Sequence, residues 1–552
     1  MPSCVRPKNP AMSEADISVR TNDGAAGMPV PGVPEAYTPQ ASAAAPSVVP
    51  STARLYSVLR LMFSFPAMLG TFLVGRVFYE ARTFFVDPDL WWHIKTGENI
   101  LATHHWPTTD PYSFTVAGQP WIATEWLGDV LLATAARFSG VVGLQALLIV
   151  LSSVVVLALY AFATLRSGNS KAGFASSAVL CSLAFASFTL RPQMLGYLFL
   201  ILTLIALERF RRGQYRAAWF LPALFLVWIN AHGSWVIGLG TIFMYWMSGL
   251  MAFRLGSLEI KPWTATERKS ISLVFLLCLA VLPLTPYGTR PAAYPFEVAS
   301  QLPIGVSNVA EWQSMPFNLV DGRLFLGLLL GFIVLQVIFR FTWRLEELAL
   351  FLFGTMMACL HMRFLLLFVP FSAGLFAAMM AGWMPPYDRK KDHFVLNAIL
   401  MSGVAFAMVY YYPSRQNIER HVSQQFPTGT VKYLRQHHIG GPLLNNYRFG
   451  GYLVWAGQRV FVDGRSDPYE RGGALSDYLY VTRLKPGTMN VLKAYGIQAC
   501  LLEPDEPLAT FLAASPEWER VASDEVAALF VRKSAAASPE TGHREPPLSE
   551  KE

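Results

Sequence analysis

The sequence predicts an α-helical polytopic membrane protein that carries a C-terminal α/β domain outside the membrane. Three observations lead to this prediction. The chain of 552 residues is 53% hydrophobic and only 15% charged, whereas soluble proteins average about 25% charged residues. About eleven apolar stretches, most of them near the ~20 residues that a span requires, lie between Val58 and Pro413. Arginine and lysine gather mostly in alternate gaps between these stretches, which is the distribution expected of cytoplasmic loops.

Hydropathy places each span, and the basic loops then give the orientation. We expect spans near residues 58–80, 141–165, 172–190, 192–209, 216–231, 235–253, 269–285, 322–340, 345–361, 363–382 and 394–412. A twelfth candidate, 121–138, holds three charged residues. If it crossed the membrane, and the N-terminus stayed inside, all the basic loops would fall outside. We therefore predict that 121–138 lies at the membrane interface, with Trp121 and Trp126 as headgroup anchors.

This scheme divides the chain into four parts. Residues 1–52, rich in Ala, Pro, Ser and Val, are expected to be a disordered cytoplasmic tail. Residues 53–413 form the membrane domain, with outer loops at 81–140 and 286–321. Residues 414–533 are expected outside as an α/β domain, and 534–552 as a disordered tail. Within the outer domain, strand-like runs at 460–462, 499–502 and 528–531 alternate with helical runs at 429–438, 487–495 and 508–515.

Composition and motifs argue against several classes of function. The net charge of +7 comes mostly from short basic loops beside the spans, so nucleic acid is not an expected partner. The five cysteines are scattered and form no CxxC pair, so neither a zinc site nor a disulfide framework is expected. No apolar run precedes residue 58, so no cleavable signal peptide is expected. Walker A, dinucleotide-binding, G-x-S-x-G and H-E-x-x-H motifs are absent from the sequence.

One candidate site opens the first outer loop, in the run Asp87-Pro-Asp89-Leu-Trp-Trp-His93. Two carboxylates two residues apart can share a divalent cation such as Mg or Mn. Alternatively, one can act as a general base that the other orients. Pro88 restricts the backbone between them. A polar loop with an aromatic anchor at the interface is the competing interpretation.

Further candidates lie in the same loop and at the outer ends of spans. Arg191 and Arg363 are charges at membrane depth, where charges are costly and usually functional or paired. A planar guanidinium suits a phosphate, although snorkelling to the headgroups is an equal explanation. His232, in an Asn-Ala-His-Gly-Ser-Trp run, could line a substrate site or simply pack in the core. Glu125 faces the outer surface from the interfacial segment, as a ligand or as a solvated polar residue.

A last motif, Asp463-Gly-Arg465-Ser-Asp467, follows a strand-like run of the outer domain. Loops at strand ends often bind ligands, and these side chains suit a sugar or a phosphate. A salt-bridged turn that closes the domain is the competing interpretation. The expected substrate contacts are therefore His93, Glu125, Arg191, His232, Arg363, Asp463, Arg465 and Asp467, with Asp87 and Asp89 as catalytic residues and the candidate metal ligands.

An inside N-terminus, a first span and a large outer loop that opens with Asp-x-Asp resemble the GT-C membrane glycosyltransferases. These include the protein mannosyltransferases, the oligosaccharyltransferases, and bacterial arabinosyl and lipid-A sugar transferases. The architecture matches over 58–412, and the motifs match mainly at Asp87-Pro-Asp89 and between Pro107 and Trp126. The segments beginning at Gly450 and Phe461 look like those of uncharacterised bacterial multi-pass proteins of this type.

The resemblance implies a polyprenyl-phosphate-linked sugar donor and transfer on the extracytoplasmic side. It makes Asp87 the base for the acceptor hydroxyl or a metal ligand, with Asp89 as its partner. The outer domain lacks the Trp-Trp-Asp-Tyr-Gly signature of the oligosaccharyltransferases. Transfer of a whole oligosaccharide to asparagine is therefore not expected.

We accordingly expect an integral glycosyltransferase of the bacterial inner membrane that moves a hexosyl or pentosyl group to a glycan, lipid or protein acceptor of the envelope. Two alternatives remain open. A transporter or flippase for lipid-linked sugars would need polar residues that continue to the inner leaflet. A non-catalytic scaffold of envelope assembly would leave the outer carboxylates dispensable.

Overall fold

The computed structural model describes residues 51–83, 87–184, 188–301, 303–308 and 310–533. The chain divides into two compact units, Met1–Tyr56 and Ser57–Glu552, and every element after α1 belongs to the second. Of the predicted tail 1–52, only residues 51 and 52 are described. The predicted tail 534–552 lies outside the described residues.

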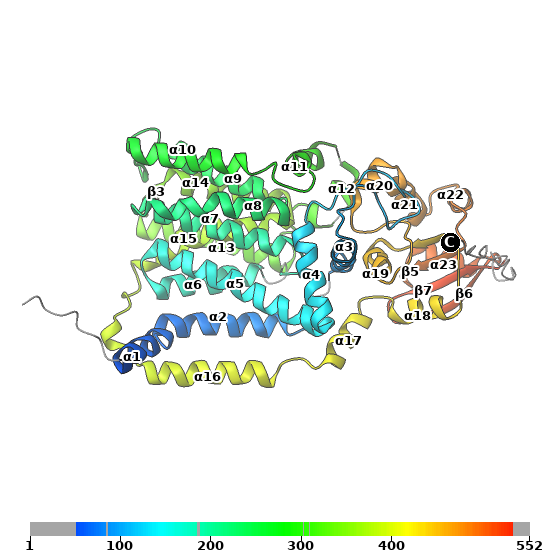
Figure 1. Ribbon diagram of the computed structural model, residues 1–552, viewed down its shortest axis with the longest axis horizontal. Helices are drawn as coiled ribbons and strands as arrows, with labels where there is room; N and C mark the ends of the chain where they lie inside the picture. The colour runs from blue at the N-terminus through cyan, green and yellow to red at the C-terminus, as the bar shows by residue number, and fades with distance from the viewer. Residues whose placement is uncertain (1–50, 84–86, 185–187, 302, 309, 534–552) are drawn as a thin grey trace, which may run out of the picture. The chain divides into compact units, whose positions relative to one another are not determined.

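Helices occur at all the predicted spans (Figure 1). They are α1 (Ser51–Met62), α2 (Phe65–Ala81), α5 (Val141–Ser167), α6 (Ser170–Ala184), α7 (Gln193–Arg211), η2 (Tyr215–Phe220) with α8 (Leu221–Ala231), α9 (Trp235–Ser248), α10 (Ala265–Ala280), α13 (Val320–Phe339), α14 (Leu345–Leu360), η4 (Met362–Phe364) with α15 (Leu365–Ala381), and α16 (Phe394–Tyr410). A short 3-10 helix, η5 (Arg389–Lys391), lies in the loop before α16.

Several of these helices have the length and composition of membrane spans. Within the described chain, four qualify alone: Val141–Ser167, Gln193–Arg211, Val320–Phe339 and Met362–Ala381. The number rises to six if each of two bent pairs, α1 with α2 and α16 with α17 (Arg415–Ser423), is one span. The chain is thus a membrane protein with at least four to six apolar spans, and the figure of eleven stays a prediction.

The segment 121–138 forms α4 (Trp126–Ser139), which lies crosswise to α2 and α5 (Figure 1). Its 14 residues are too few for a span. The rest of the first outer loop holds α3 (Leu90–Thr103), which packs on α4, and an irregular segment. The second outer loop holds α11 (Arg290–Gln301), α12 (Pro303–Asn308) and η3 (Ala310–Trp312).

The C-terminal segment contains a four-stranded sheet and several short helices, and its existence as a separate outer domain stays a prediction. Its sheet has the order β4-β5-β7-β6, with β4 parallel to β5 and the other neighbours antiparallel. The elements are α18 (Thr428–Gln436), β4 (Leu443–Asn445), η6 (Tyr447–Phe449), α19 (Gly450–Trp455), α20 (Ser466–Arg471), α21 (Ala474–Thr482), α22 (Thr488–Ala494), β5 (Ala499–Leu502), α23 (Pro507–Ala514), β6 (Trp518–Ser523) and β7 (Ala528–Arg532). A second sheet, β1 (Phe253–Leu255), β2 (Leu258–Ile260) and β3 (Trp343–Arg344), joins two loops between helices.

The predicted strand at 460–462 is wrong, although those at 499–502 and 528–531 are confirmed. Val460 makes only an isolated bridge, to Ser113 of the first outer loop. The next residue, Phe461, donates its backbone N–H to the Asn445 side chain at 2.8 Å rather than to a neighbouring strand. The run is apolar because it is buried between the first outer loop and the sheet, not because it belongs to a ladder.

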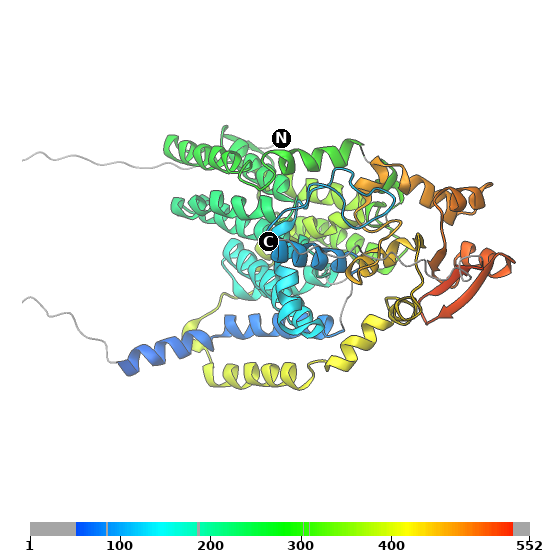
Figure 2. The same cartoon turned by 45° about the vertical axis from the view of Figure 1, so that its right-hand side comes forward.

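Side-chain contacts define the two ends of the helical bundle. At one end, Asn397 of α16 donates to the Phe63 carbonyl oxygen before α2, at 2.9 Å. At the other, the Tyr412 hydroxyl after α16 donates to the Val142 carbonyl oxygen at the start of α5, at 3.4 Å. Figures 1 and 2 show α3, α12 and α17 to α21 at this second end. An apolar core that includes Trp91 of α3 and Phe426 continues from α3 into the C-terminal segment.

Candidate active site

Asp87 and Asp89 lie in the short segment between α2 and α3. The backbone N–H of Asp89 donates to Asp87 Oδ1 at 2.8 Å. Trp92, in the first turn of α3, donates its indole N–H to Asp89 Oδ1 at 3.1 Å. Asp87 is only 5% exposed. The start of α3 therefore fixes the two carboxylates relative to each other, with Asp87 almost fully buried.

The backbone of the C-terminal segment lies directly against this motif. A β-carbon at Gly464 would lie 1.5 Å from Asp89 Oδ1, and one at Gly451 would lie 2.2 Å from the Pro88 carbonyl oxygen. Real β-carbons do not approach atoms so closely, so a larger residue at Gly464 would displace the Asp89 carboxylate, and one at Gly451 would displace backbone. Both glycines belong to motifs that stand out in the sequence. No sequence pattern around either glycine predicts its contact with the aspartate motif, which lies more than 350 residues earlier in the chain.

Arg191 joins the two aspartates to a third carboxylate. Its Nε lies 2.5 Å from Asp87 Oδ1, its Nη2 3.2 Å from Asp89 Oδ2 and its Nη1 3.3 Å from Glu311 Oε1. We call Asp87, Asp89, Arg191 and Glu311 the acidic cluster. If all three carboxylates are ionised, the acidic cluster has an excess of negative charge, because it contains only one guanidinium. Glu311 is a site residue that the sequence analysis did not single out, because an acidic residue in a loop is ordinary.

A second group, which we call the histidine cluster, consists of His93, Glu125, Asp129 and His232. His93 Nδ1 is 2.5 Å from Asp129 Oδ1, and its Nε2 is 3.9 Å from Glu125 Oε2. His232 Nε2 is 3.4 Å from Glu125 Oε1, while its Nδ1 lies 2.8 Å from Ser234 Oγ. Ionisable groups therefore run in an unbroken series from α4 through α3 to the α8–α9 turn.

Trp92 connects the two clusters. Its indole N–H donates to Asp89 in the acidic cluster, and its ring stacks on His93 with a centroid separation of 3.6 Å. Asp129 is a further residue that the sequence did not single out, because its role depends on the packing of α3 against α4. The two clusters thus form one continuous polar region at the second end of the bundle.

Burial raises the pKa of one carboxyl in each cluster. The pKa of Asp87 rises to about 6 because burial penalises its charged form, although Arg191 opposes the shift. The pKa of Glu125 rises to about 7, again because of burial, against the opposing charges of Arg363 and Arg191. A carboxyl that titrates near neutral pH can accept or donate a proton at working pH.

The other members of the histidine cluster are driven to their neutral forms. Burial lowers the pKa of His232 to about 3 and also lowers the pKa of His93. Burial, together with the charge of Glu125, raises the pKa of Asp129 well above its ordinary value. Both histidines are therefore neutral near pH 7 and can accept as well as donate hydrogen bonds.

Arg363, in η4, is a cation that pairs with no carboxylate in the described part of the chain. Its guanidinium lies over the Trp312 ring, 4.4 Å from the centroid. Its charge lowers the pKa of both Glu125 and His232, as does the charge of Arg191. Two arginines from spans distant in sequence therefore act on the same region. Arg191 is already surrounded by carboxylates, whereas Arg363 retains its charge for an anion.

Asp463 and Arg465 lie in a buried group beside the acidic cluster. Arg465 Nη2 is 2.6 Å from Asp463 Oδ2, and its Nη1 is 2.7 Å from Asp110 Oδ1 in the first outer loop. The Tyr469 hydroxyl donates to Asp463 Oδ2 at 2.6 Å. All four residues are at least 96% buried. These contacts favour the salt-bridged turn over a ligand loop, and they hold Gly464 in place against the aspartate motif.

Asp467 and the rest of α20 face the second outer loop. Burial raises the pKa of Asp467 to about 7, and its charge acts on Tyr294 of α11. The Glu470 carboxylate accepts the backbone N–H groups of Ile304 and Gly305 at 2.7 and 2.8 Å. The structure thus places Asp467 near the second outer loop, and its predicted substrate contact stays a prediction.

The residues present fit a divalent cation poorly. The described chain holds no group of three or more His, Cys, Asp or Glu side chains that could hold a metal ion. The two carboxylates of the Asp-x-Asp motif are both paired with Arg191, which would have to move away before a cation could be shared between them. The chemistry of this donor set therefore suits a guanidinium better than Mg or Mn.

No protein-family model and no curated protein matches this chain. Among solved structures, it is similar to the archaeal oligosaccharyltransferase AglB from Archaeoglobus fulgidus, in complex with an inhibitory peptide and a dolichol-phosphate. That similarity has a TM-score of 0.46 and 10% identity, and covers 79% of this chain and 69% of AglB.

The chain is also similar to ArnT from Cupriavidus metallidurans bound to undecaprenyl phosphate, with a TM-score of 0.46 and 14% identity over 88% of this chain and 100% of ArnT. The apo state of ArnT gives a TM-score of 0.43 and 16% identity. The function proposed below rests on the geometry of the two clusters.

Proposed function

We propose that this protein is a GT-C-like glycosyltransferase of the bacterial inner membrane. It would move a hexosyl or pentosyl group from a polyprenyl-phosphate-linked donor to a glycan, lipid or protein acceptor on the extracytoplasmic face. The observation that carries the proposal is the arrangement of Asp87 and Asp89 around Arg191, together with Arg363, which has no carboxylate partner among the described residues and acts on the same region. General acid–base chemistry and anion stabilisation are thus available side by side at the end of the spans.

The proposed reaction is a direct displacement at the anomeric carbon. The acceptor hydroxyl oxygen bonds to that carbon while its proton passes to Asp87. The contacts of Asp87 with Arg191 and with the Asp89 N–H both fall on Oδ1, so Oδ2 would take the proton. The bond from the anomeric carbon to the phosphate oxygen breaks, and its electron pair stays on the lipid phosphate. Arg363 stabilises this developing charge, and Arg191 keeps the two aspartates in position.

Charges at the other end of the bundle bear on the transporter alternative. Glu208, Glu346 and Glu347 are buried there. Each pairs with an arginine near a helix end: Arg212 and Arg344 with Glu208, Arg211 with Glu346, and Arg166 with Glu347. Because every one of these acids is neutralised, the cluster is explained by helix packing. It gives no support to a polar path through the membrane.

A deletion strain complemented with variants tests the proposal. The change in envelope glycan on deletion identifies the sugar, and Asp87→Asn should fail to restore it, with a loss of transfer of ~10²–10⁴-fold in vesicles. Expression should stay near wild type, and the melting temperature should fall less than in Arg191→Lys, because Asn keeps the size of the buried side chain and Arg191 keeps its other two partners. Asp321→Asn is the matched control, since Asp321 is exposed at the start of α13. Full complementation by Asp87→Asn would contradict the mechanism and favour the scaffold.

A further inference from the structure

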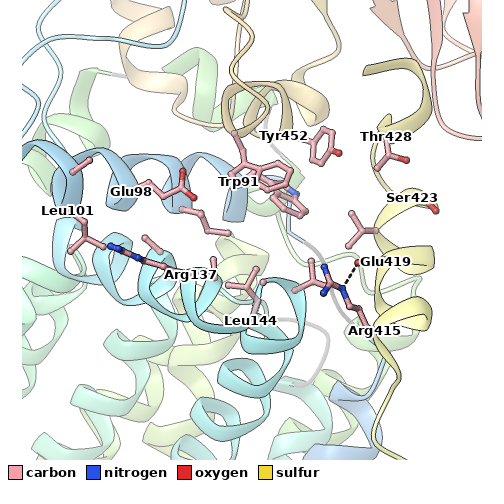
Figure 3. A pocket seen from close by; sticks show the side chains of 18 residues that line it. Trp91, Glu98, Leu101, Arg137, Leu144, Arg415, Glu419, Ser423, Thr428 and Tyr452 are labelled. Carbon is pink, nitrogen blue, oxygen red and sulfur yellow. Dashed lines mark hydrogen bonds and ion pairs between the residues drawn. The ribbon is translucent and has the colours of Figure 1, made fainter. Parts of the chain in front are cut away.

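A cavity of about 700 Å³ lies against α3 (Figure 3). The two clusters lie on a different face of this helix. Trp91, Ile94 and Glu98 line it in one helical stripe, whereas Trp92 and His93 point to the clusters. The other walls come from α4, the start of α5, α17 and α19. Its volume falls within the range of about 300–1,000 Å³ that ligand pockets occupy.

The cavity lies where a spanning helix begins. Val141 and Leu144, the first residues of the apolar span Val141–Ser167, form part of its wall. Val422 of α17, the helix that follows the bend after α16, forms another part, and Tyr452 and Trp455 of α19 add aromatic surface. A largely apolar cavity at the end of a spanning helix suits a hydrocarbon chain better than a polar soluble ligand.

The charged side chains around the cavity leave one cation unpaired. Arg415 pairs with Glu419 at 2.8 Å, which Figure 3 shows at the right of the cavity. Glu98 pairs with Lys95 at 3.7 Å. Arg137, at the exposed end of α4, has no carboxylate partner among the described residues. The rim therefore presents one free guanidinium, which suits a phosphate group.

A second unpaired group lies within the wall. The indole N–H of Trp91 is buried and has no hydrogen-bond partner in the described chain, although Trp91 lines the cavity. Buried donors without a partner are costly. The indole nitrogen itself is not exposed to the cavity, so a bound molecule would reach this donor only if the ring turned.

We propose that this cavity binds a bilayer lipid with an anionic headgroup, with its hydrocarbon chain in the cavity and its phosphate beside Arg137. The occupant follows from the position at the end of a span, the apolar walls and the free cation at the rim. This lipid site is separate from the candidate active site and does not depend on the proposed transferase function. Because α3 forms a wall of the lipid site and also carries Trp92 and His93, lipid binding would help to hold α3 in place.

Photolabelling of the full chain tests the proposal. The protein is placed in vesicles of phosphatidylcholine that contain a phosphatidylglycerol with a diazirine in its acyl chain, and labelled peptides are mapped by mass spectrometry. We expect labels at the cavity, on Leu101, Leu144 or Trp455. Ala102→Trp, which fills the cavity from an exposed position, should lower this labelling about tenfold, as expected when about two methylenes lose their apolar site.

Arg137→Gln should lower labelling by the phosphatidylglycerol probe but not by a diacylglycerol probe with the same chain, which has no phosphate. Ala513→Trp and Arg520→Gln, exposed in the C-terminal segment, are the matched controls and should change neither. Cavity labelling that survives Ala102→Trp, or labels confined to the spans, would overturn the lipid site. An equal response of both probes to Arg137→Gln would overturn the headgroup contact. A melting temperature equal to wild type shows that each variant is folded.

Discussion

At the residue scale, the two outer arginines hold different partners and should fail differently when changed. Arg363 stacks on Trp312 without a carboxylate partner in the described chain, so Arg363→Lys should raise the KM for the lipid-linked donor. A charged hydrogen bond contributes about 1.5–3 kcal/mol, so its loss should raise this KM roughly tenfold or more. The melting temperature should change little, because no ion pair of the described residues is lost. Donor titration in vesicles measures the effect.

The matching change at Arg191 should act on folding as well as on turnover. Lysine cannot reach three carboxylates in the fork geometry that Arg191 uses, so Arg191→Lys should lower both kcat and the melting temperature. Arg323→Lys, exposed on α13, is the control. A rise in donor KM for Arg191→Lys together with wild-type behaviour of Arg363→Lys would reverse the roles assigned here.

Glu125 should make stability depend on pH. Its folded pKa of about 7 lies above the ordinary value of 4.5 because of burial, so the folded state binds the proton more tightly than the unfolded state. This contribution is fully present below about pH 4.5 and is lost as the pH rises through about 7. We expect the melting temperature to fall between about pH 5 and pH 8, and to fall less in Glu125→Gln. Glu525→Gln, exposed between β6 and β7, should leave the fall unchanged; an unchanged fall in Glu125→Gln would show that Glu125 is not its source.

Which site residues could be read from the sequence depends on how far apart the contacting residues lie. Asp87, Asp89 and Arg191 stand out because a charge next to a long apolar run is costly wherever it lies. Glu311 and Asp129 carry no such signal. Glu311 lies in a loop where acids are ordinary, and Asp129 meets His93 only because α3 packs on α4. Arg465 stands out in the sequence as part of a motif. Only its ion pair with Asp110 shows that it connects the C-terminal segment to the loop between α3 and α4.

At the element scale, the contact of Gly464 with Asp89 should control the candidate site from the C-terminal segment. A methyl group at Gly464 overlaps the Asp89 carboxylate, so Gly464→Ala must displace one of the two. We expect a loss of stability of about 1–3 kcal/mol, the usual cost of overpacking, and a loss of transfer beyond what that instability explains. Thermal melts and transfer in vesicles measure the two effects.

A double-mutant cycle separates this steric effect from a general loss of fold. Removing the Asp89 side chain in Asp89→Ala should make Gly464→Ala nearly neutral for stability, because nothing remains for the methyl group to overlap. Gly403→Ala on α16, where a β-carbon would meet nothing within 4 Å, is the control. Equal destabilisation by Gly464→Ala in both backgrounds would disprove the contact.

The secondary-structure elements themselves were predictable to different degrees. The helices follow from long apolar runs, which have few other solutions in a membrane, and each predicted span holds one. Short strands carry less information. The three residues of β4 were missed, whereas the apolar run at 460–462 was mistaken for a strand because burial against a loop and burial in a sheet leave the same pattern.

At the scale of the whole molecule, the contacts between helices give the bundle two chemically distinct ends. One end carries the acidic and histidine clusters. The other carries arginines that the positive-inside rule places in the cytoplasm, but these are held by buried glutamates, as in the pairs Arg166–Glu347 and Arg211–Glu346. The arginines of the basic loops thus have two roles, in membrane orientation and in helix packing. Composition alone does not separate these roles. Orientation in the membrane is therefore a prediction from charge rather than a property of the helices.

Reporter fusions test that orientation. Arg212 contacts the Arg166 carbonyl oxygen at the end of α5, and Met384, shortly before Lys391, accepts from Asn169 just after α5, so both positions lie at the arginine-rich end. Fusions after Arg212 and after Lys391 should report cytoplasm, and fusions at Gly118 and Gly472 should report the outside, because excess Lys and Arg stay on the cytoplasmic side. A cytoplasmic Gly472 would place the C-terminal segment and the acidic cluster inside the cell, where a donor displayed on the outer face could not reach Asp87.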